Sequence, residues 1–157
     1  EPLRRRGLAS ASFDGDGVAT HNRDLIHDGV LQSYLLDVYS ARKLGLQSTG
    51  NAGGAHNLTL APGSEDLAAL LQQMGRGLLV TELIGFGVNG VTGDYSRGAA
   101  GFWVENGEIQ YPVEEITIAG HLREMFAGFV AVGSDLLIHG GTGSPSILID
   151  KMTVAGN

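Results

Sequence analysis

Four polar residues in a glycine-rich stretch are the side chains of this sequence best placed to meet a ligand. They are Asn89, Thr92, Asp94 and Ser96, and they lie among closely spaced glycines in the segment Gly85–Glu108. Glycine permits positive φ angles and allows another chain to approach the backbone closely. We therefore predict that the polar side chains of this loop face an incoming ligand, for which a peptide is a natural candidate.

Two motifs of catalytic or cofactor-binding proteins overlap this loop, but neither has the flanking structure that its chemistry requires. Gly85-x-Gly87-x-x-Gly90 has the spacing of a dinucleotide fingerprint, which needs a following helix to hold the pyrophosphate. Asp94-Tyr-Ser-Arg-Gly98 is similar to a nucleophile elbow without its first glycine. No helix is predicted after either motif, so we expect no nucleotide site and no nucleophilic role for Ser96.

Metal ligands are also missing from their usual spacings. Asp14-x-Asp16 begins like a calcium loop, but the later ligand positions do not match, so we predict a plain turn. The sequence has no cysteine, and its histidines show no two-ligand helical spacing. The histidines are His21, His27, His56, His121 and His139. We predict no metal site and no catalytic residue in this chain, and we expect His121 to lie at the start of a helix.

Composition and charge limit the class of partner. The net charge of −7 opposes binding to nucleic acid, which needs a basic surface. No apolar run approaches the roughly 20 residues of a membrane span, so no membrane partner is expected. The 157 residues suit one domain with a hydrophobic core. Because the chain begins at Glu1 without methionine, we expect a fragment of a longer protein.

The elements that would position the glycine-rich loop predict an α+β fold, dominated by antiparallel β-hairpins with two short helices and glycine-rich loops. Asn106-Gly107 between Gly101–Glu105 and Glu108–Val113 is a strong hairpin signal. Leu67, Leu70, Leu71 and Met74 form an apolar helical stripe, with Ser64 as the expected N-cap.

Further elements are predicted from shorter patterns. Helical turns are expected over Asp37–Leu44, ending at Gly45, and over Leu122–Phe129. Strands are expected at Gly7–Ser12, Val30–Leu36, Asn57–Leu60, Gly77–Ile84, Ile116–Ala119, Val130–Ile138 and Ile147–Val154.

Several long motifs together resemble the C-terminal domain of the TldD/PmbA family, and more closely its PmbA branch, also called TldE. The resemblance covers nearly the whole chain, so residues 1–157 are interpreted as one such domain. The matching segments are Ser33–Asp37 with Ser40–Gly45, Thr49–Ala52, Gly85–Glu108, Tyr111–Gly120 and Met152–Asn157.

The resemblance implies a role in a peptidase assembly. In the family, a TldD-type protein with a His-Glu-x-x-x-His zinc motif pairs with a PmbA-type protein, degrades unfolded peptides and processes a microcin precursor. The TldD branch places a cysteine ligand where this chain reads Gly140-Gly-Thr-Gly-Ser-Pro145, without a thiol. The resemblance therefore implies a subunit that binds no metal, with zinc in its TldD-type partner and Asn89, Thr92, Asp94 and Ser96 lining a peptide groove or supporting the partner's cleft.

Two other interpretations remain open at this stage. The chain could belong to a non-enzymatic regulatory module that acts on a topoisomerase or a toxin–antitoxin system, since an older label of the family is modulator of DNA gyrase. It could also belong to a self-associating enzyme with its own metal motif upstream. In each case the resemblance implies a cytoplasmic protein that forms a dimer with a paralogue or with itself.

Overall fold

The computed structural model describes residues 1–156, and the chain divides into two compact units. The first unit contains residues 1–61 and 137–144, and the second contains residues 62–136 and those from 145 onward. Asn157, which ends both the predicted domain and the Met152–Asn157 motif, lies outside the described residues. The predicted class is confirmed, because strands dominate and nearly all of their pairings are antiparallel. The described residues form three helices, one more than expected.

The first unit has short elements joined by long irregular segments. They are β1 (Ile26–His27), β2 (Val30–Leu31), α1 (Val38–Leu44), β3 (Leu58–Thr59), β8 (Leu137–His139) and β9 (Thr142–Ser144). Strands β1 and β2 form a small hairpin, and β9 lies between β3 and β8. The helical turns predicted over Asp37–Leu44 are confirmed as α1, which is capped by the Asp37 carboxylate and ends at Gly45 with a positive φ. The predicted count of two helices did not include this short helix.

Two predicted strands of this unit are wrong in whole or in part. Gly7–Ser12 forms successive tight turns, because the Ser10 N–H donates to the Gly7 carbonyl instead of to a neighbouring strand. The strand expected over Val30–Leu36 ends at Leu31, because the next two amide groups both donate to the carbonyl of Leu25. Local hydrogen bonds therefore replace the ladder that the apolar pattern suggested.

Asp14 organises the loops of the first unit. One carboxylate oxygen accepts from the N–H groups of Asp16 and Val18 at 3.0 and 2.9 Å, and the other accepts from Ala52 at 2.9 Å. The Asp14-x-Asp16 segment is thus the predicted turn, closed by backbone donors. These bonds, that from Ala52 first, lower the pKa of Asp14 below its ordinary value of 3.8, although burial opposes the shift.

Replacing Asp14 by asparagine should make stability less dependent on acid pH. A lowered pKa means that the ionised carboxylate stabilises the fold at pH values above 3.8, and that this contribution is lost as the pH falls through the folded-state pKa. In urea titrations, Asp14→Asn should unfold at lower urea than the native protein near neutral pH, and the difference should narrow below about pH 4. The exposed carboxylate variant Glu114→Gln is the control. If the difference in unfolding midpoint between Asp14→Asn and the native protein stays constant from neutral to acid pH, the Asp14 carboxylate does not stabilise the fold through its charge.

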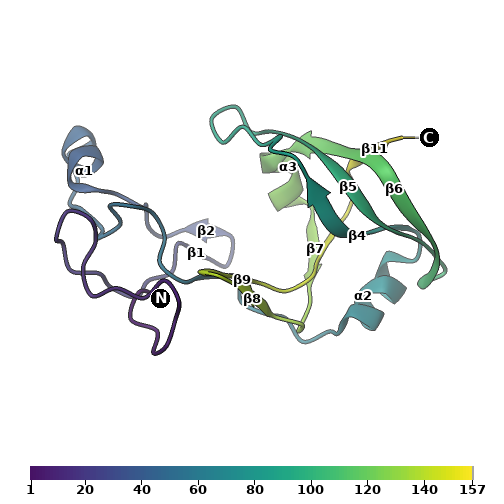
Figure 1. Cartoon of the computed structure of the whole chain (residues 1–157), viewed down its shortest axis with the longest axis horizontal. Coiled ribbons are helices and arrows are strands. Elements are labelled where there is room, and N and C mark those ends of the chain that lie inside the picture. The colour runs from purple at the N-terminus through teal and green to yellow at the C-terminus, as the bar shows by residue number, and fades with distance from the viewer. Residues whose placement is uncertain (157) are drawn as a thin grey trace. The chain divides into compact units, whose positions relative to one another are not determined.

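The second unit is built on one antiparallel sheet with the strand order β11-β6-β5-β4 (Figure 1). Its elements are α2 (Leu67–Met74), β4 (Gly77–Ile84), β5 (Asp94–Glu105), β6 (Glu108–His121), α3 (Leu122–Ala127), β7 (Phe129–Val132), β10 (Ile147–Ile149) and β11 (Thr153–Ala155). Strands β7 and β10 form a separate antiparallel pair. None of the helices within residues 1–156 has the length and apolar content needed to cross a membrane.

The central hairpin β5–β6 is longer than its sequence signal. The predicted turn is confirmed, since Asn106 and Gly107 both have positive φ angles and Glu105 pairs with Glu108. The strands predicted over Gly77–Ile84 and Ile116–Ala119 are confirmed as β4 and as part of β6. Buried apolar side chains on the two hairpin strands form the core of the sheet, and they are Ala99, Ile116 and Ile118. This core fixes the register that brings the end of β6 beside the start of β5.

The helices of this unit follow their predicted positions, with different ends. Helix α2 has the expected apolar stripe, but its N-cap is Asp66, which accepts from the Ala69 N–H at 2.8 Å, and not Ser64. The carboxylate lies directly before the first helical residue, where it can reach the free amides. Helix α3 stops at Ala127, two residues earlier than predicted, because Gly128 breaks it and Phe129 begins β7.

The two closing strands are interrupted. The span Val130–Ile138 divides into β7 and β8, and Ile147–Val154 divides into β10 and β11. The first interruption contains Asp135, whose carboxylate accepts hydrogen bonds from the backbone N–H and the hydroxyl of Ser146 at 2.9 and 2.6 Å. A turn held by side-chain hydrogen bonds therefore lies where apolar periodicity predicted a continuous strand.

Candidate functional site

Residues 85–93 of the glycine-rich segment connect β4 to β5, and this loop extends past the end of the sheet (Figure 1). Val88 bridges to Tyr95, the Ser96 N–H donates to the Gly87 carbonyl at 2.7 Å, and the Asn89 N–H donates to the Asp94 carbonyl at 2.9 Å. The irregular loop is therefore short. Asp94 and Ser96, expected in a loop, are residues of strand β5.

Two of the predicted site residues shape the tip of this hairpin. The Asn89 side-chain oxygen accepts from the N–H groups of Val91 and Thr92 at 2.9 and 3.2 Å. The Thr92 hydroxyl donates to one carboxylate oxygen of Asp94 at 2.6 Å. Asn89 and Thr92 thus use their side-chain oxygens within the turn. Their contribution to a site is to hold the loop in place.

The other two predicted residues present unused polar groups. Within residues 1–156, the Ser96 hydroxyl and the second carboxylate oxygen of Asp94 have no hydrogen-bond partner, and both residues are exposed. A hollow of about 270 Å³ lies beside them. Its lining residues are Phe86, Gly87, Val88, Asn89, Asp94 and Ser96. The structure therefore brings three of the four predicted residues to one hollow and ties Thr92 to it through Asp94.

Apolar side chains border this polar hollow. Phe86 and Val91 are almost completely exposed, with relative accessibilities of 105% and 97%, and Ile84 and Val88 are about half exposed. Exposed apolar groups beside unpaired hydrogen-bonding groups are typical of a surface that binds another chain. A ligand at this surface could make hydrogen bonds and bury apolar area at the same time.

His121 connects the loop to helix α3, a connection that the sequence did not reveal. Its Nδ1 accepts from the Arg123 N–H at 3.2 Å, so the neutral ring carries its proton on Nε2 and donates it to the Thr92 carbonyl at 3.0 Å. The predicted position at a helix start is confirmed, because His121 is the N-cap of α3. Its pairing with Asp94 across β5 and β6 could be found only from the strand register.

Strands flank the two loop motifs. The segment after Gly90 leads into strand β5 and not into a helix, so the pyrophosphate-binding geometry of a dinucleotide site is missing. Ser96 lies within a paired strand instead of on a sharp strand-to-helix turn. Among residues 1–156, no three His, Asp or Glu side chains are grouped so that they could hold a metal ion.

Comparison with known proteins identifies the family of this chain. A family model described as the PmbA/TldA metallopeptidase C-terminal domain matches residues 1–156. The chain belongs to the PmbA/TldD metallopeptidase family. The metalloprotease PmbA of Escherichia coli O157:H7 is 56% identical over 155 residues, which are 99% of this chain and 34% of that protein. The resemblance to the family and to its PmbA branch is therefore confirmed.

Solved structures of related proteins share the fold. A Thermotoga maritima protein described as a proposed modulator of a DNA gyrase superposes with a TM-score of 0.91 at 40% identity, covering 99% of this chain and 38% of that protein. TldE from Thermococcus kodakarensis, at 24% identity and a TM-score of 0.77, covers 93% of this chain and 36% of its own, and supports the fold alone. This chain of the PmbA/TldD family spans about a third of the length of the PmbA relatives that it matches.

Proposed function

We propose that this chain is the C-terminal domain of a PmbA-type protein and acts in the subunit of a cytoplasmic zinc metallopeptidase that binds no metal itself. The observation that supports this proposal most strongly is the 56% identity to metalloprotease PmbA over nearly the whole chain. The partner is a TldD-type paralogue, and the substrates are unfolded peptides and peptide precursors. Zinc held by the partner would activate water for attack on a peptide carbonyl.

In this proposal, the hollow between the hairpin tip and β5 holds an extended peptide. Asp94 and Ser96 offer it an unpaired carboxylate oxygen and a hydroxyl group. The neighbouring strand β4 is an edge strand of the four-stranded sheet, and its last residues, Glu82–Ile84, are exposed. An exposed edge strand can accept an added peptide strand through backbone hydrogen bonds, which do not depend on the peptide sequence. Such binding suits a protein that acts on many unfolded substrates.

The double substitution of Asp94 and Ser96 by alanine tests this groove. Because both side chains face solvent at the hollow, their loss should leave the fold intact. It should lower kcat/KM for an unfolded peptide roughly tenfold in the assembly of the full-length protein with its TldD-type paralogue, the factor that corresponds to about 1.4 kcal/mol of lost binding. Peptide hydrolysis and circular dichroism are measured on the same samples.

The matched control for that variant is Glu108→Ala, an exposed charge at the opposite end of the same hairpin. Cleavage should be unchanged by this substitution. Unchanged cleavage by the Asp94→Ala/Ser96→Ala protein would mean that this groove does not bind the peptide. The assignment to a peptidase assembly would not be decided by that result, because cleavage in the presence of the TldD-type partner tests it.

A regulatory role is the second candidate, supported by the description of the Thermotoga maritima relative as a proposed modulator of a DNA gyrase. A regulator of gyrase or of a toxin–antitoxin system would keep its effect after complete removal of zinc. The peptidase would lose its activity under the same treatment. Zinc dependence therefore separates the two candidates.

A further inference from the structure

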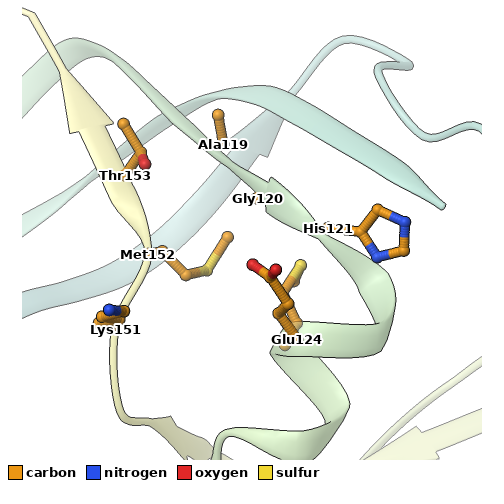
Figure 2. Close-up of a pocket in the computed structure, with 8 residues that line it drawn as sticks. Ala119, Gly120, His121, Glu124, Lys151, Met152 and Thr153 are labelled. Atoms are coloured by element: carbon orange, nitrogen blue, oxygen red, sulfur yellow. The ribbon is translucent and has the colours of Figure 1, made fainter.

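A second hollow, of about 300 Å³, lies at the same end of the sheet as the proposed peptide groove. It opens where strand β11 separates from β6: Thr153 still pairs with Ala119, but the chain before it moves away from Gly120 (Figure 2). The lining residues that determine its chemistry are Gly120, His121, Glu124, Met125, Lys151 and Met152. It is open to solvent and could receive a side chain.

Two methionines make one wall of this hollow apolar. A Cβ atom placed on Gly120 would lie 3.6 Å from Met125 Cγ and 3.7 Å from Met152 Cε, so the two thioether chains converge at Gly120. Both methionines are only half buried. Methionine is flexible and adapts its shape to unbranched aliphatic chains. This wall therefore favours a long aliphatic stem over a compact polar group.

A free carboxylate lies at the hollow as well. Glu124 points into it and faces Met152 (Figure 2), and within residues 1–156 its side chain has no ion pair and no hydrogen bond. The ring nitrogens of His121 bond to the Thr92 carbonyl and the Arg123 N–H and make no contact with this carboxylate. Together with the net charge of −7, the unpaired carboxylate favours a cationic group.

Lys151 adds a charge of the opposite sign on the other chain segment of the hollow. Within the described residues its ammonium group has neither an ion-pair partner nor a hydrogen bond. An ammonium group is a donor only, so it suits a carbonyl oxygen or a carboxylate. A ligand that fits both charges has an aliphatic stem ending in a cation and an oxygen acceptor near the base of that stem, as a lysine or arginine residue of a peptide has.

We propose that this second hollow is a subsite for a basic side chain of the peptide that occupies the groove, an inference that rests on the proposed function. The stem lies against Met125 and Met152, the cationic end meets Glu124, and a carbonyl oxygen of the same peptide meets Lys151. The two hollows are neighbours, because Asp94 and His121 are paired on adjacent strands. Adjacent strands are about 5 Å apart, and an extended peptide advances about 3.3 Å per residue, so one peptide can reach both hollows.

The test uses the full-length protein assembled with its TldD-type paralogue. Unfolded fluorogenic peptides carry lysine, norleucine or glutamate at each position in turn and are otherwise identical. At one position, lysine should give a kcat/KM about fivefold above norleucine and about tenfold above glutamate. Glu124→Gln should abolish the preference for lysine, and Glu124→Lys should reverse it in favour of glutamate. Glu114→Gln, an exposed carboxylate outside the hollow, should leave the preference intact.

A variant that fills the hollow tests the effect of its volume on cleavage separately from the effect of the Glu124 charge. Gly120 has no positive φ, so Gly120→Leu can keep the backbone and fill the space between the methionines. It should lower cleavage of the lysine and norleucine peptides alike at that position. Equal preference for lysine in Glu124→Gln and in the native protein would overturn the subsite.

Binding is measured in parallel, so that the subsite is decided independently of catalysis. Fluorescence anisotropy gives the affinity of the full-length protein for the lysine and glutamate peptides. A preference for lysine that is lost in Glu124→Gln supports the subsite, and equal affinities overturn it, whether or not any mixture cleaves. Two results together would support the proposed function but not the subsite. They are reduced cleavage by the Asp94→Ala/Ser96→Ala protein and no effect of Glu124→Gln on the preference for lysine.

Discussion

In the proposed peptidase assembly, Gly87→Ala should lower peptide cleavage about tenfold or more. An added Cβ at this position would collide with the backbone carbonyl of Ser96. The two backbone segments of the hairpin lie closer together there than any side chain allows. The substitution would break the hydrogen bond from the Ser96 N–H to the Gly87 carbonyl and displace the hairpin tip. Steady-state hydrolysis of an unfolded peptide measures the loss, and a factor of ten corresponds to about 1.4 kcal/mol.

The neighbouring variant Gly90→Ala is the matched control for this prediction. Gly90 has no positive φ, and a Cβ there would meet no atom within 4 Å. It should leave both cleavage and stability within about 0.5 kcal/mol of the native protein. The overall stability of Gly87→Ala should also change by less than about 1 kcal/mol, since the hairpin tip lies outside the core. If Gly87→Ala cleaves peptide as fast as Gly90→Ala, the position of the hairpin tip does not matter for activity.

Gly101→Ala should destabilise the protein by about 3 kcal/mol, the upper end of the range for overpacking a filled interior. Gly101 lies in the middle of the sheet, paired with Val80 on β4 and Val113 on β6. An alanine Cβ would collide with the carbonyl of Leu79, and the Val80 Cα would be only 3.0 Å away. Neither contact is the movable end of a side chain, so the sheet itself must shift. Urea unfolding followed by the fluorescence of Trp103, the single tryptophan of the sequence, measures the change.

The control within the same strand is Gly98→Ala. There the nearest atom to an added Cβ is the Ile84 Cβ at 3.3 Å, which the edge strand β4 can accommodate by a small movement. This variant should lose less than about 1 kcal/mol. Equal destabilisation by the two substitutions would mean that the close approach of Gly101 to β4 is not a determinant of stability.

The parts of the fold that follow from local chemistry were predictable from the sequence. Asn106-Gly107 fixes the hairpin turn through its positive φ angles, and the apolar stripe of α2 requires only the helical period. In each case the residues that determine the structure are within a few positions of one another, so the pattern is visible along the chain.

The start of strand β5 was not predictable, because long-range pairing determines it. The residues Gly98–Gly101 are small and have little preference for strands by themselves, yet they form the middle of β5 between two partner strands. The sequence therefore suggested that the loop continued through Asp94 and Ser96. Tertiary hydrogen bonding overrides local propensity here.

The candidate site was predictable only in part for the same reason. The four polar residues were found because they are close together among glycines, and three of them line one hollow. Their separate roles depend on hydrogen bonds in the turn, which use the side-chain oxygens of Asn89 and Thr92. These bonds leave one carboxylate oxygen of Asp94 and the Ser96 hydroxyl available. The second hollow joins residues from β6 and the segment before β11, about 30 positions apart, so only the register of the sheet reveals it.

The measurement that tests the central claim most directly is hydrolysis of an unfolded peptide by the full-length protein, alone and mixed with its His-Glu-x-x-x-His paralogue, with and without a zinc chelator. The proposal predicts cleavage only in the mixture, and its complete loss when zinc is removed. Cleavage by the full-length protein alone would contradict the assignment to a subunit without metal. Absence of cleavage in every mixture would contradict the peptidase role and favour the regulator.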